Sequence, residues 1–368
     1  MKFSCSQKEL LKAVLIAVKA TGKSGNLPIL ENIFLKCFGQ NLEISATNLE
    51  ISILTKILAE IKNEGEVTIP AKIFSSWLNL ISDEVIDFEK KEGETIFLKT
   101  QNSKTNLKGF PSDDFPKIPN VPRENECEIL IKDFKSALQK TLFATSNSET
   151  RPILSGVLLI SDENKLVLVS TDSYRLSEIK IPFSISPKKE IYSIIPNKTL
   201  LEVDRILNGK HEDEKIKIIF SENQVLFQIG NTQLISRLIE GKFPDYKKII
   251  PTNFKNEIYI NRKDFLQNIK RVSLFAQENS NSIQLSCKEN ELEIFTSETE
   301  IGNEKVVMKL KEKVSENIIS INSQFLLDAI LVFSSEEIYL KFGEKLNPIL
   351  ISSKQDSDFQ HIIMPLKT

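Results

Sequence analysis

The sequence predicts an α+β protein made of three repeats of about 120 residues, each with two helices and antiparallel strands. The first observation is a helix start that occurs three times, each with apolar residues at helical spacing. These starts read KELLKAVLIAV from Lys8, KDFKSALQKTLF from Lys132 and KDFLQNIKRVSLF from Lys263. A chain of 368 residues is long enough for three such domains, each with its own core.

A second observation is a short β-branched strand that runs directly into a helix. It reads VTIPAKIFSSWLNLI, YSIIPNKTLLEVDRIL and ISINSQFLLDAILVF, with Pro70, Pro196 and Asn322 at the junctions. Proline suits a helix start because the N–H it lacks would be unpaired there. The third observation is a strand, a tight polar turn and a second strand, which reads LEISATNLEIS, LVLVSTDSYRLS and LEIFTSETEIG.

Polar, proline-bearing stretches near residues 122–124 and 251–256 separate the repeats. We therefore predict domains at 1–123, 124–252 and 253–368. A further correspondence links GFPSDDFPKIP to GKFPDYKKIIP, with FQHIIMPL as a shortened version at the end of the chain. Three equivalent copies in one chain favour an arc, ring or scaffold over a single catalytic pocket.

The composition excludes several classes of protein. The longest uncharged apolar stretches fall far short of the roughly 20 residues that span a bilayer, and the N-terminus has no apolar signal region. We therefore expect a cytoplasmic protein. The four cysteines are widely spaced and have no neighbouring histidine, so we expect free or buried thiols and no zinc site.

Charge is distributed unevenly among the predicted elements. The six predicted helices together carry +7 and the rest of the chain −9, which gives the net charge of −2. A basic helical layer on an acidic body suits contact with a phosphate backbone on one side only. Lysines that cover exposed helix faces give the same pattern without any nucleic acid.

Several motifs imitate catalytic sites. TGKSG at 21–25 lacks the first glycine of a phosphate-binding loop, because position 17 is Ala17, and HEDEK at 211–215 lacks the second histidine of a zinc protease. Only two histidines, His211 and His361, are present, and His361 lies on an apolar strand, where we expect a structural role or a place in a groove. Asp113 and Asp114 lie in a proline-flanked turn, where aspartate bonds to the backbone.

TDSYRL at 171–176 places a hydroxyl, a carboxylate, a phenol and a guanidinium side by side. Ser173 has no general base near it in sequence, so a strand–turn–strand is the simpler interpretation. A DNA-processing, metal-dependent hydrolase that uses Asp172 or Asp113 remains the alternative.

The order and spacing of the motifs resemble the bacterial β sliding clamp, the processivity subunit of DNA polymerase III, over essentially the full length. The motifs that carry the resemblance are MKF at the N-terminus, LPIL at 27–30, ETRPILSGVLL at 149–159, TDSYRL at 171–176, GKFPDYKKIIP at 241–251 and IIMPL at 362–366. The resemblance implies the DNA clamp fold, with one chain forming a half ring and a head-to-tail homodimer closing the ring around duplex DNA. It implies no catalytic activity and no cofactor.

The resemblance also implies partners and sites. Expected partners are sequence-independent duplex DNA, DNA polymerase III and other polymerases, a clamp loader, and mismatch-repair and ligase-type proteins that bind through short peptide motifs. The DNA-facing residues would be Lys12, Lys19, Lys23, Lys72, Lys140, Lys198, Lys270 and Arg271. The dimer contacts would be Lys104 and Leu107 in the first domain with Leu274 and Phe275 in the third.

The family's peptide groove lies between the second and third domains. Carried over by motif, its lining would be Arg151, Leu154, Thr171, Ser173, Tyr174, Arg175, Leu176, Pro244, Lys248, Ile249, Phe325, Leu346, Pro348, Ile362, Ile363, Met364, Pro365 and Leu366. Apolar walls with a methionine that repacks suit varied apolar anchors. Relatives often have glycine, histidine and arginine where this chain has Ser173, Tyr174 and Lys248, and a larger apolar residue where it has Thr105.

Overall fold

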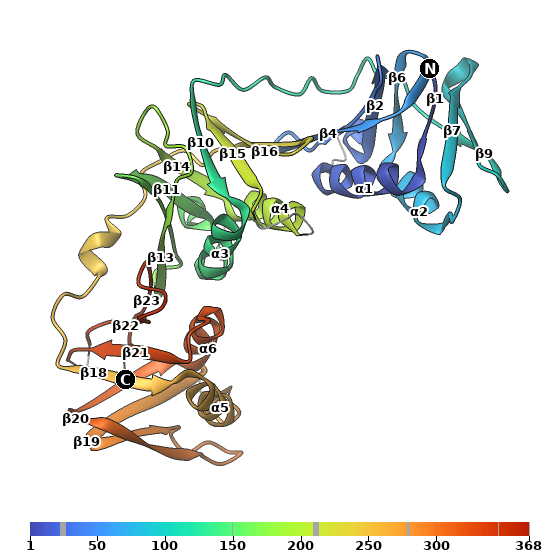
Figure 1. The fold of residues 1–368 in the computed structure, drawn as a ribbon. Helices are drawn as coiled ribbons and strands as arrows, with labels where there is room; N and C mark the ends of the chain where they lie inside the picture. The colour runs from blue at the N-terminus through green and yellow to red at the C-terminus, as the bar shows by residue number, and fades with distance from the viewer. Residues whose placement is uncertain (23–26, 149, 209–212, 278–279, 345, 368) are drawn as a thin grey trace. The chain divides into compact units, whose positions relative to one another are not determined.

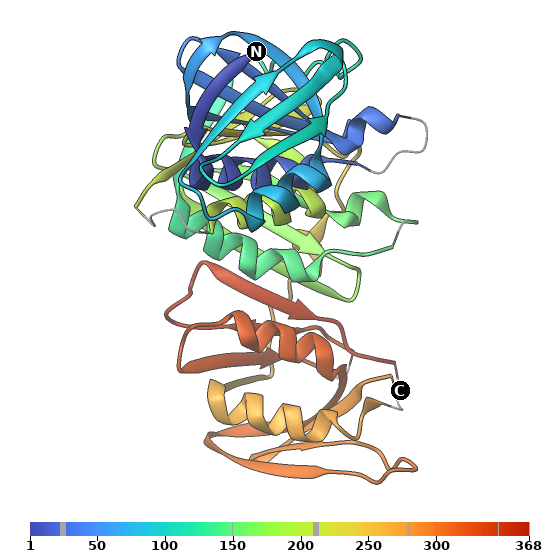
Figure 2. The ribbon, with the colours of Figure 1, turned by 90° about the vertical axis from the view of Figure 1, so that its right-hand side faces the viewer.

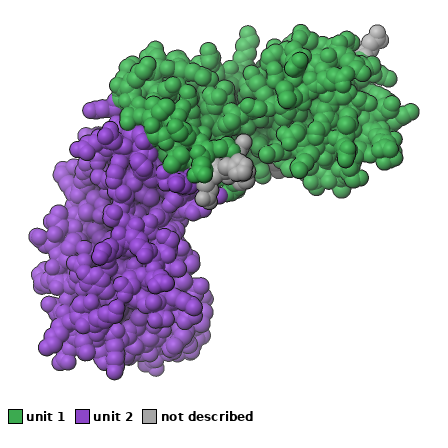
Figure 3. Space-filling model, viewed as in Figure 1, with its two compact units in different colours: residues 1–131, 184–189, 201–238 green, residues 132–183, 190–200, 239–368 purple. Residues whose placement is uncertain are grey.

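The computed structural model describes residues 1–22, 27–148, 150–208, 213–277, 280–344 and 346–367. They form two compact units, coloured separately in Figure 3. Unit 1 holds residues 1–131, 184–189 and 201–238, and unit 2 holds residues 132–183, 190–200 and 239–368. Figures 1 and 2 show the mixed helix and sheet composition of both units, which confirms the predicted α+β class.

Unit 1 is built on two sheets. The smaller sheet has the order β5 (Glu60–Asn63), β1 (Lys2–Ser6), β7 (Val85–Lys90), β8 (Thr95–Lys99) and β9 (Lys104–Lys108). The larger sheet has the order β10 (Asn125–Leu130), β15 (Lys215–Phe220), β16 (Gln224–Ile229), β17 (Thr232–Arg237), β4 (Ile51–Leu58), β3 (Asn41–Thr47), β2 (Asn32–Phe38) and β6 (Gly65–Pro70). Antiparallel pairing of β17 with β4 therefore joins the first repeat to strands of the second in one continuous sheet.

Unit 2 also contains an eight-stranded sheet, but its second sheet has two strands. Its eight-stranded sheet has the order β14 (Tyr192–Pro196), β11 (Gly156–Asp162), β12 (Lys165–Thr171), β13 (Arg175–Pro182), β23 (Phe359–Ile363), β22 (Ile349–Ser352), β21 (Glu337–Phe342) and β18 (Asn256–Asn261). A long hairpin pairs β19 (Ser282–Phe295) with β20 (Lys305–Asn322). The pairing of β13 with β23 corresponds to that of β4 with β17, so each junction between repeats is a strand pair.

The six α-helices form where the sequence predicts them. They are α1 (Gln7–Ala17), α2 (Ala71–Leu80), α3 (Ile131–Thr141), α4 (Asn197–Leu207), α5 (Arg262–Ser273) and α6 (Ser323–Val332). The buried side chains Leu10, Val14 and Ala17 of α1 follow helical spacing, as do Phe265, Ile269 and Val272 of α5. Phe265 is fully buried, and burial of such a side chain contributes about 2 to 3 kcal/mol of stability.

Helix starts differ between the repeats in how they are capped. Asn322 caps α6, because its side-chain oxygen accepts hydrogen bonds from the backbone N–H groups of Gln324 and Phe325. Pro70 and Pro196 instead end strands β6 and β14, one residue before α2 and α4 begin. Each proline stays paired across its sheet, Pro70 with Asn32 and Pro196 with Gly156.

The strand–turn–strand prediction is confirmed in two repeats and wrong in the third. In the first two repeats three residues separate β3 from β4 and β12 from β13. In the third, β19 ends at Phe295 and β20 begins at Lys305, and Thr299 pairs with Gly302 inside the loop between them. The residues read as a second strand in SETEIG therefore belong to this wider loop.

The repeat extends to individual hydrogen bonds in the turns. In the first repeat the hydroxyl of Thr47 donates to the carbonyl of Ile51 at 3.1 Å, and the amide N–H of Ile51 donates to the side chain of Asn48 at 2.8 Å. In the second, Thr171 donates to the carbonyl of Arg175 at 2.7 Å, and the N–H of Arg175 donates to Asp172 at 2.9 Å.

Candidate functional site

The turn at 172–174 is held by the carboxylate of Asp172. One of its oxygens accepts the backbone N–H groups of Tyr174 and Arg175, both at 2.9 Å, and the other accepts from Nε of Arg175 at 2.9 Å. Ser173 has φ of +80°, a backbone conformation that favours glycine, and its hydroxyl accepts a hydrogen bond from Arg151 at 2.7 Å. Asp172 therefore stabilises the turn. The hydroxyl of Ser173 bonds to the guanidinium of Arg151, and a guanidinium cannot act as a general base.

Arg175 connects three segments of unit 2. Besides Asp172, its guanidinium donates to Asp328 on α6 at 2.6 Å and to the carbonyl of Phe143 at 2.6 Å. It also lies 4.5 Å from the ring centroid of Phe325. The side chain is only 11% exposed, so this predicted groove residue is a positioning residue that ties the turn to α6.

The apolar part of the predicted groove comes together in unit 2. Leu154, Leu176 and Ile362 belong to one buried cluster, which includes Phe243 and Tyr246 from the segment at 243–250. The ring of Tyr174, 61% exposed, stacks on Phe325 with centroids 6.4 Å apart. The backbone N–H of Met364 donates to the carbonyl of Tyr174 at 2.8 Å, which places the C-terminal segment beside the turn.

Other predicted groove residues have different surroundings. Lys248 forms an ion pair with Asp245 at 2.9 Å, and its side chain is 82% exposed. Leu346 is exposed, as is Ile249 in part, whereas Ile363 is buried in the sheet opposite Arg175. Thr171 is buried and bonds within the turn, Pro244 is exposed, Pro348 and Pro365 are half-buried, and the N–H of Leu366 donates to the carbonyl of Ser320.

His361 is fully buried on β23. Its Nδ1 lies 2.7 Å from the hydroxyl of Ser177, and its ring packs against Phe143. Burial, with the nearby positive charge of Arg175, lowers the pKa of His361 to about 3. The imidazole is therefore neutral at physiological pH, and of the two roles expected for it the structural one holds.

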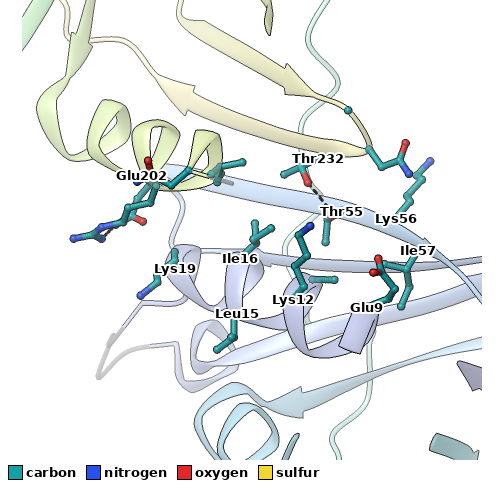
Figure 4. Close-up of a pocket in the computed structure, with 16 residues that line it drawn as sticks. Glu9, Lys12, Leu15, Ile16, Lys19, Thr55, Lys56, Ile57, Glu202 and Thr232 are labelled. Atoms are coloured by element: carbon teal, nitrogen blue, oxygen red, sulfur yellow. Dashed lines mark hydrogen bonds and ion pairs between the residues drawn. The ribbon is translucent and has the colours of Figure 1, made fainter. Parts of the chain in front are cut away.

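Two of the predicted DNA-facing lysines line one cavity in unit 1. Figure 4 shows Lys12 of α1 and Lys19 of the 3-10 turn η1 (Val18–Ala20) on this cavity of about 480 Å³, with Lys56, Glu9 and Glu202 also on its wall. The hydroxyls of Thr55 and Thr232 bond to each other at 3.0 Å across the β4–β17 seam that forms its floor. Both lysines are exposed, and neither forms an ion pair within the described ranges.

The remaining predicted basic residues fall into two groups. Lys72, Lys198 and Lys270 are exposed on α2, α4 and α5. Lys140 instead is 7% exposed and donates to Asp356 at 2.8 Å, because the helix turns its last basic residue into the unit, and Arg271 pairs with Glu304. Lys23 lies outside the described residues.

The predicted dimer contacts lie on an edge strand and after a helix. Lys104 and Leu107 belong to β9, the last strand of its sheet, which among the described strands pairs only with β8. Leu274, which follows α5, is 60% exposed, and Phe275 is half-buried. An edge strand offers unpaired backbone N–H and C=O groups to another chain.

The cysteines and acidic residues were candidates for a metal site. All four cysteines are buried and free, as the sequence predicts, and burial raises the pKa of Cys5, Cys127 and Cys287 to about 12. Within the described residues no group of three or more potential ligands could hold a metal ion. In the same part of the chain no helix is long and apolar enough to cross a membrane.

Three repeated domains joined by strand pairing, with this turn and cluster at one junction, define the DNA clamp fold. Family models of the DNA polymerase III beta subunit match consecutively: the N-terminal domain at residues 1–119, the central domain at 128–245 and the C-terminal domain at 247–367. The chain belongs to the DNA polymerase III beta subunit family, the β sliding clamps.

Individual relatives agree over their full length. The chain is 31% identical to the beta sliding clamp of Staphylococcus epidermidis and 30% identical to that of Staphylococcus aureus, in each case covering 100% of both chains. The crystal structure of the Bacillus subtilis sliding clamp has a TM-score of 0.95 at 30% identity and covers 100% of this chain and 99% of its own. That of the Streptococcus pneumoniae beta chain gives 0.94 at 27%, with full coverage of both.

Proposed function

We propose that two copies of this chain close head to tail into a ring that encircles duplex DNA and tethers a polymerase for processive synthesis. The observation that carries the proposal is the set of exposed helical lysines without ion pairs in the described residues, namely Lys12, Lys19, Lys72, Lys198 and Lys270. Lysine is a compact, mobile charge that contacts phosphates without reading sequence. Membership of the sliding clamp family supports the same function.

Encirclement is tested by DNA topology. The protein is loaded on nicked circular DNA by a clamp loader and washed at a salt concentration that removes simple electrostatic binders. We expect it to stay on the circle and to be lost after the circle is cut, because a ring slides off free ends. Equal retention on linear and circular DNA would contradict the ring.

The groove around Leu176 and Met364 is the proposed docking site for short peptides of polymerases and repair proteins. An apolar floor, an exposed aromatic ring at Tyr174 and a half-buried methionine together form a surface that receives apolar anchors. Because Arg175 is fully engaged in its own unit, we propose that Arg151, which is exposed, supplies the groove's positive charge.

Truncation of the groove wall tests this site. If a peptide rich in Gln, Leu and Phe binds near 1 μM, Met364→Ala or Leu176→Ala should weaken it about tenfold, roughly 1.4 kcal/mol. Tyr259→Ala, an exposed aromatic on β18, is the matched control and should leave the affinity unchanged. Calorimetric titration measures all three, and unchanged affinity in both groove variants would place the peptide elsewhere.

We infer that the chain itself is not an enzyme. The bonds of Asp172 within its turn support this inference. Metal-dependent cleavage of DNA by the purified protein, lost in Asp172→Asn or Asp113→Asn, would establish the hydrolase alternative instead.

A further inference from the structure

Unit 1 contains a second cavity, of about 770 Å³, beneath the segment 112–123. We call this segment the first strap, because it crosses from β9 to β10. The cavity lies between the strap and the outer-facing side chains of β2, β3, β4, β6, β16 and β17. Its lining includes Phe34, Lys36, Glu43, Ser45, Leu54, Glu66, Phe115, Ile118, Leu226, Gln233 and Ile235.

The floor of this cavity has a counterpart in unit 2, position for position. Phe34 pairs with Ser45 across β2 and β3, as Leu158 pairs with Val169 across β11 and β12. In the same way the pair Lys36 and Glu43 corresponds to Ile160 and Val167. The strand pairs at the two junctions also correspond. Leu54 pairs with Gln233 in unit 1, and the equivalent pair in unit 2 is Glu178 with Gln360.

In unit 2 the equivalent floor is covered by the chain itself. The segment 243–250, which we call the second strap, inserts Phe243 and Tyr246 into a buried cluster with Leu158, Val167 and Val169. Tyr246 is 5% exposed, and its hydroxyl bonds to Glu178. Unit 2 therefore shows what such a floor accepts, which is an aromatic side chain with a bonded hydroxyl.

The first strap has an equivalent of Phe243 but no equivalent of Tyr246. Phe115 stacks on Phe34 with ring centroids 5.2 Å apart, and in unit 2 the corresponding residues Phe243 and Leu158 belong to one buried cluster. Three residues later the first strap has Ile118 where the second has Tyr246, and Ile118 packs against Leu226 and Ile235. Isoleucine is smaller than tyrosine, and Phe115 and Ile118 both line the cavity.

The cavity is apolar at one end and polar at the other. Leu54, Leu226 and Ile235 form the apolar end, and Lys36, Glu43 and Glu66 form the polar end. Glu66 is engaged twice, by Lys36 at 3.4 Å and by the hydroxyl of Ser112 at 3.0 Å. One oxygen of Glu43 pairs with Lys56 at 3.5 Å, and within the described residues its other oxygen accepts no hydrogen bond. The polar end thus offers an acceptor to a hydroxyl donor.

We propose that this cavity binds the tyrosine side chain of a partner's peptide, with the ring between Phe115 and the apolar end and the hydroxyl donating to Glu43. The second strap, which buries Tyr246 on the equivalent floor of unit 2, is the template for the aromatic ring of that ligand. The acceptor of the Tyr246 hydroxyl, Glu178, corresponds to Leu54 in unit 1, so the acceptor proposed there is instead Glu43 on the neighbouring strand β3. The site lies wholly in unit 1, whereas the groove around Leu176 lies wholly in unit 2. One chain would then hold two peptide sites of different preference.

The test uses a blocked peptide with the sequence of residues 242–248, KFPDYKK, carrying fluorotyrosine at the tyrosine position. Titrated with the full chain, its fluorine NMR signal should shift and saturate. Replacing the tyrosine by alanine, with fluorine placed on the phenylalanine instead, should weaken binding at least tenfold. Equal binding of the two peptides would overturn the proposal.

Two variants of the chain locate the site. Ser45→Leu places a larger apolar side chain on the floor and should weaken binding at least tenfold, while the same change at exposed Ser76 on α2 should have no effect. Glu43→Gln, which keeps the side-chain volume, should shrink the preference for a tyrosine peptide over its phenylalanine analogue. Circular dichroism confirms that each variant is folded, and if Ser45→Leu fails to fold, Glu43→Gln decides alone. Three outcomes would refute the site. They are wild-type affinity in folded Ser45→Leu, an unchanged preference for tyrosine in Glu43→Gln, and loss of peptide binding in the double variant Leu176→Ala with Met364→Ala.

Discussion

His361 is a buried base whose neutral form the fold requires. The unfolded chain binds a proton at this residue below pH 6.5, whereas the folded chain does so only near its lowered pKa of about 3. Unfolding therefore takes up a proton between these two values, and the stability that neutral His361 allows above pH 6.5 is lost as the pH falls.

We predict that the free energy of unfolding falls by up to about 1.4 kcal/mol per pH unit from this residue below pH 6.5. His361→Gln, which retains a partner for Ser177, should remove that part of the slope between pH 6.5 and 5.5. Urea unfolding followed by circular dichroism at several pH values measures it, and His211 is common to both proteins. Equal slopes in the two proteins would mean that His361 titrates normally in the folded state.

At the scale of elements, Arg175 joins the turn after β12 to helix α6. A lysine at this position keeps one charge but cannot donate to Asp172, Asp328 and the carbonyl of Phe143 in the plane of a guanidinium. We predict that Arg175→Lys lowers the free energy of unfolding by about 3 kcal/mol, because a mostly buried ion pair loses its geometry. Arg123→Lys is the control, since Arg123 is exposed and among the described residues bonds only to Gln228, and should change stability by less than about 0.5 kcal/mol. Denaturant unfolding gives both free-energy differences. A similarly small effect at the two positions would show that Arg175 does not hold the turn to α6.

Elements were predictable where a local pattern determines them. The six helices follow from apolar spacing, and the first two polar turns follow from Asn48 and Asp172, which bond to their own backbone. The third turn was not predictable, because SETEIG has similar polar composition but lies inside a nine-residue loop that the long β19–β20 hairpin sets. The burial of Lys140 was also hidden, since Asp356 lies 216 residues further along the chain.

The pairing between repeats is a property of the whole chain, and sequence periodicity carries no information about it. The apolar pattern of strand β4 is the same whether its neighbour is β17 or solvent. The register that pairs Leu234 with Ile53 is therefore seen only in the assembled sheet. From the resemblance to the clamp family we predicted that Leu154, Leu176 and Met364 line one groove. The resemblance did not reveal the bonds of Arg175 to Asp328 and to the carbonyl of Phe143, because neither residue lies in the motifs that carry the resemblance. Nor did it reveal the cavity under the first strap, because its lining comes from segments far apart in the sequence.

The proposed ring depends on a contact between two chains, and Leu274 is the residue whose change tests it most directly. This side chain is 60% exposed in the single chain, which leaves it available to a partner. In the dimer, Leu274→Asp would remove the burial of a leucine and desolvate a carboxylate, together at least about 3 kcal/mol, or a hundredfold weaker association. Sedimentation at micromolar concentration should then show a monomer where the unchanged chain is a dimer. Retention on circular DNA should be lost with it, while the affinity of the groove for its peptide should remain, because no groove residue changes. Leu80→Asp, at an exposed leucine of α2, is the matched control and should stay dimeric. If Leu274→Asp sediments as a dimer, the contact between subunits lies on another surface.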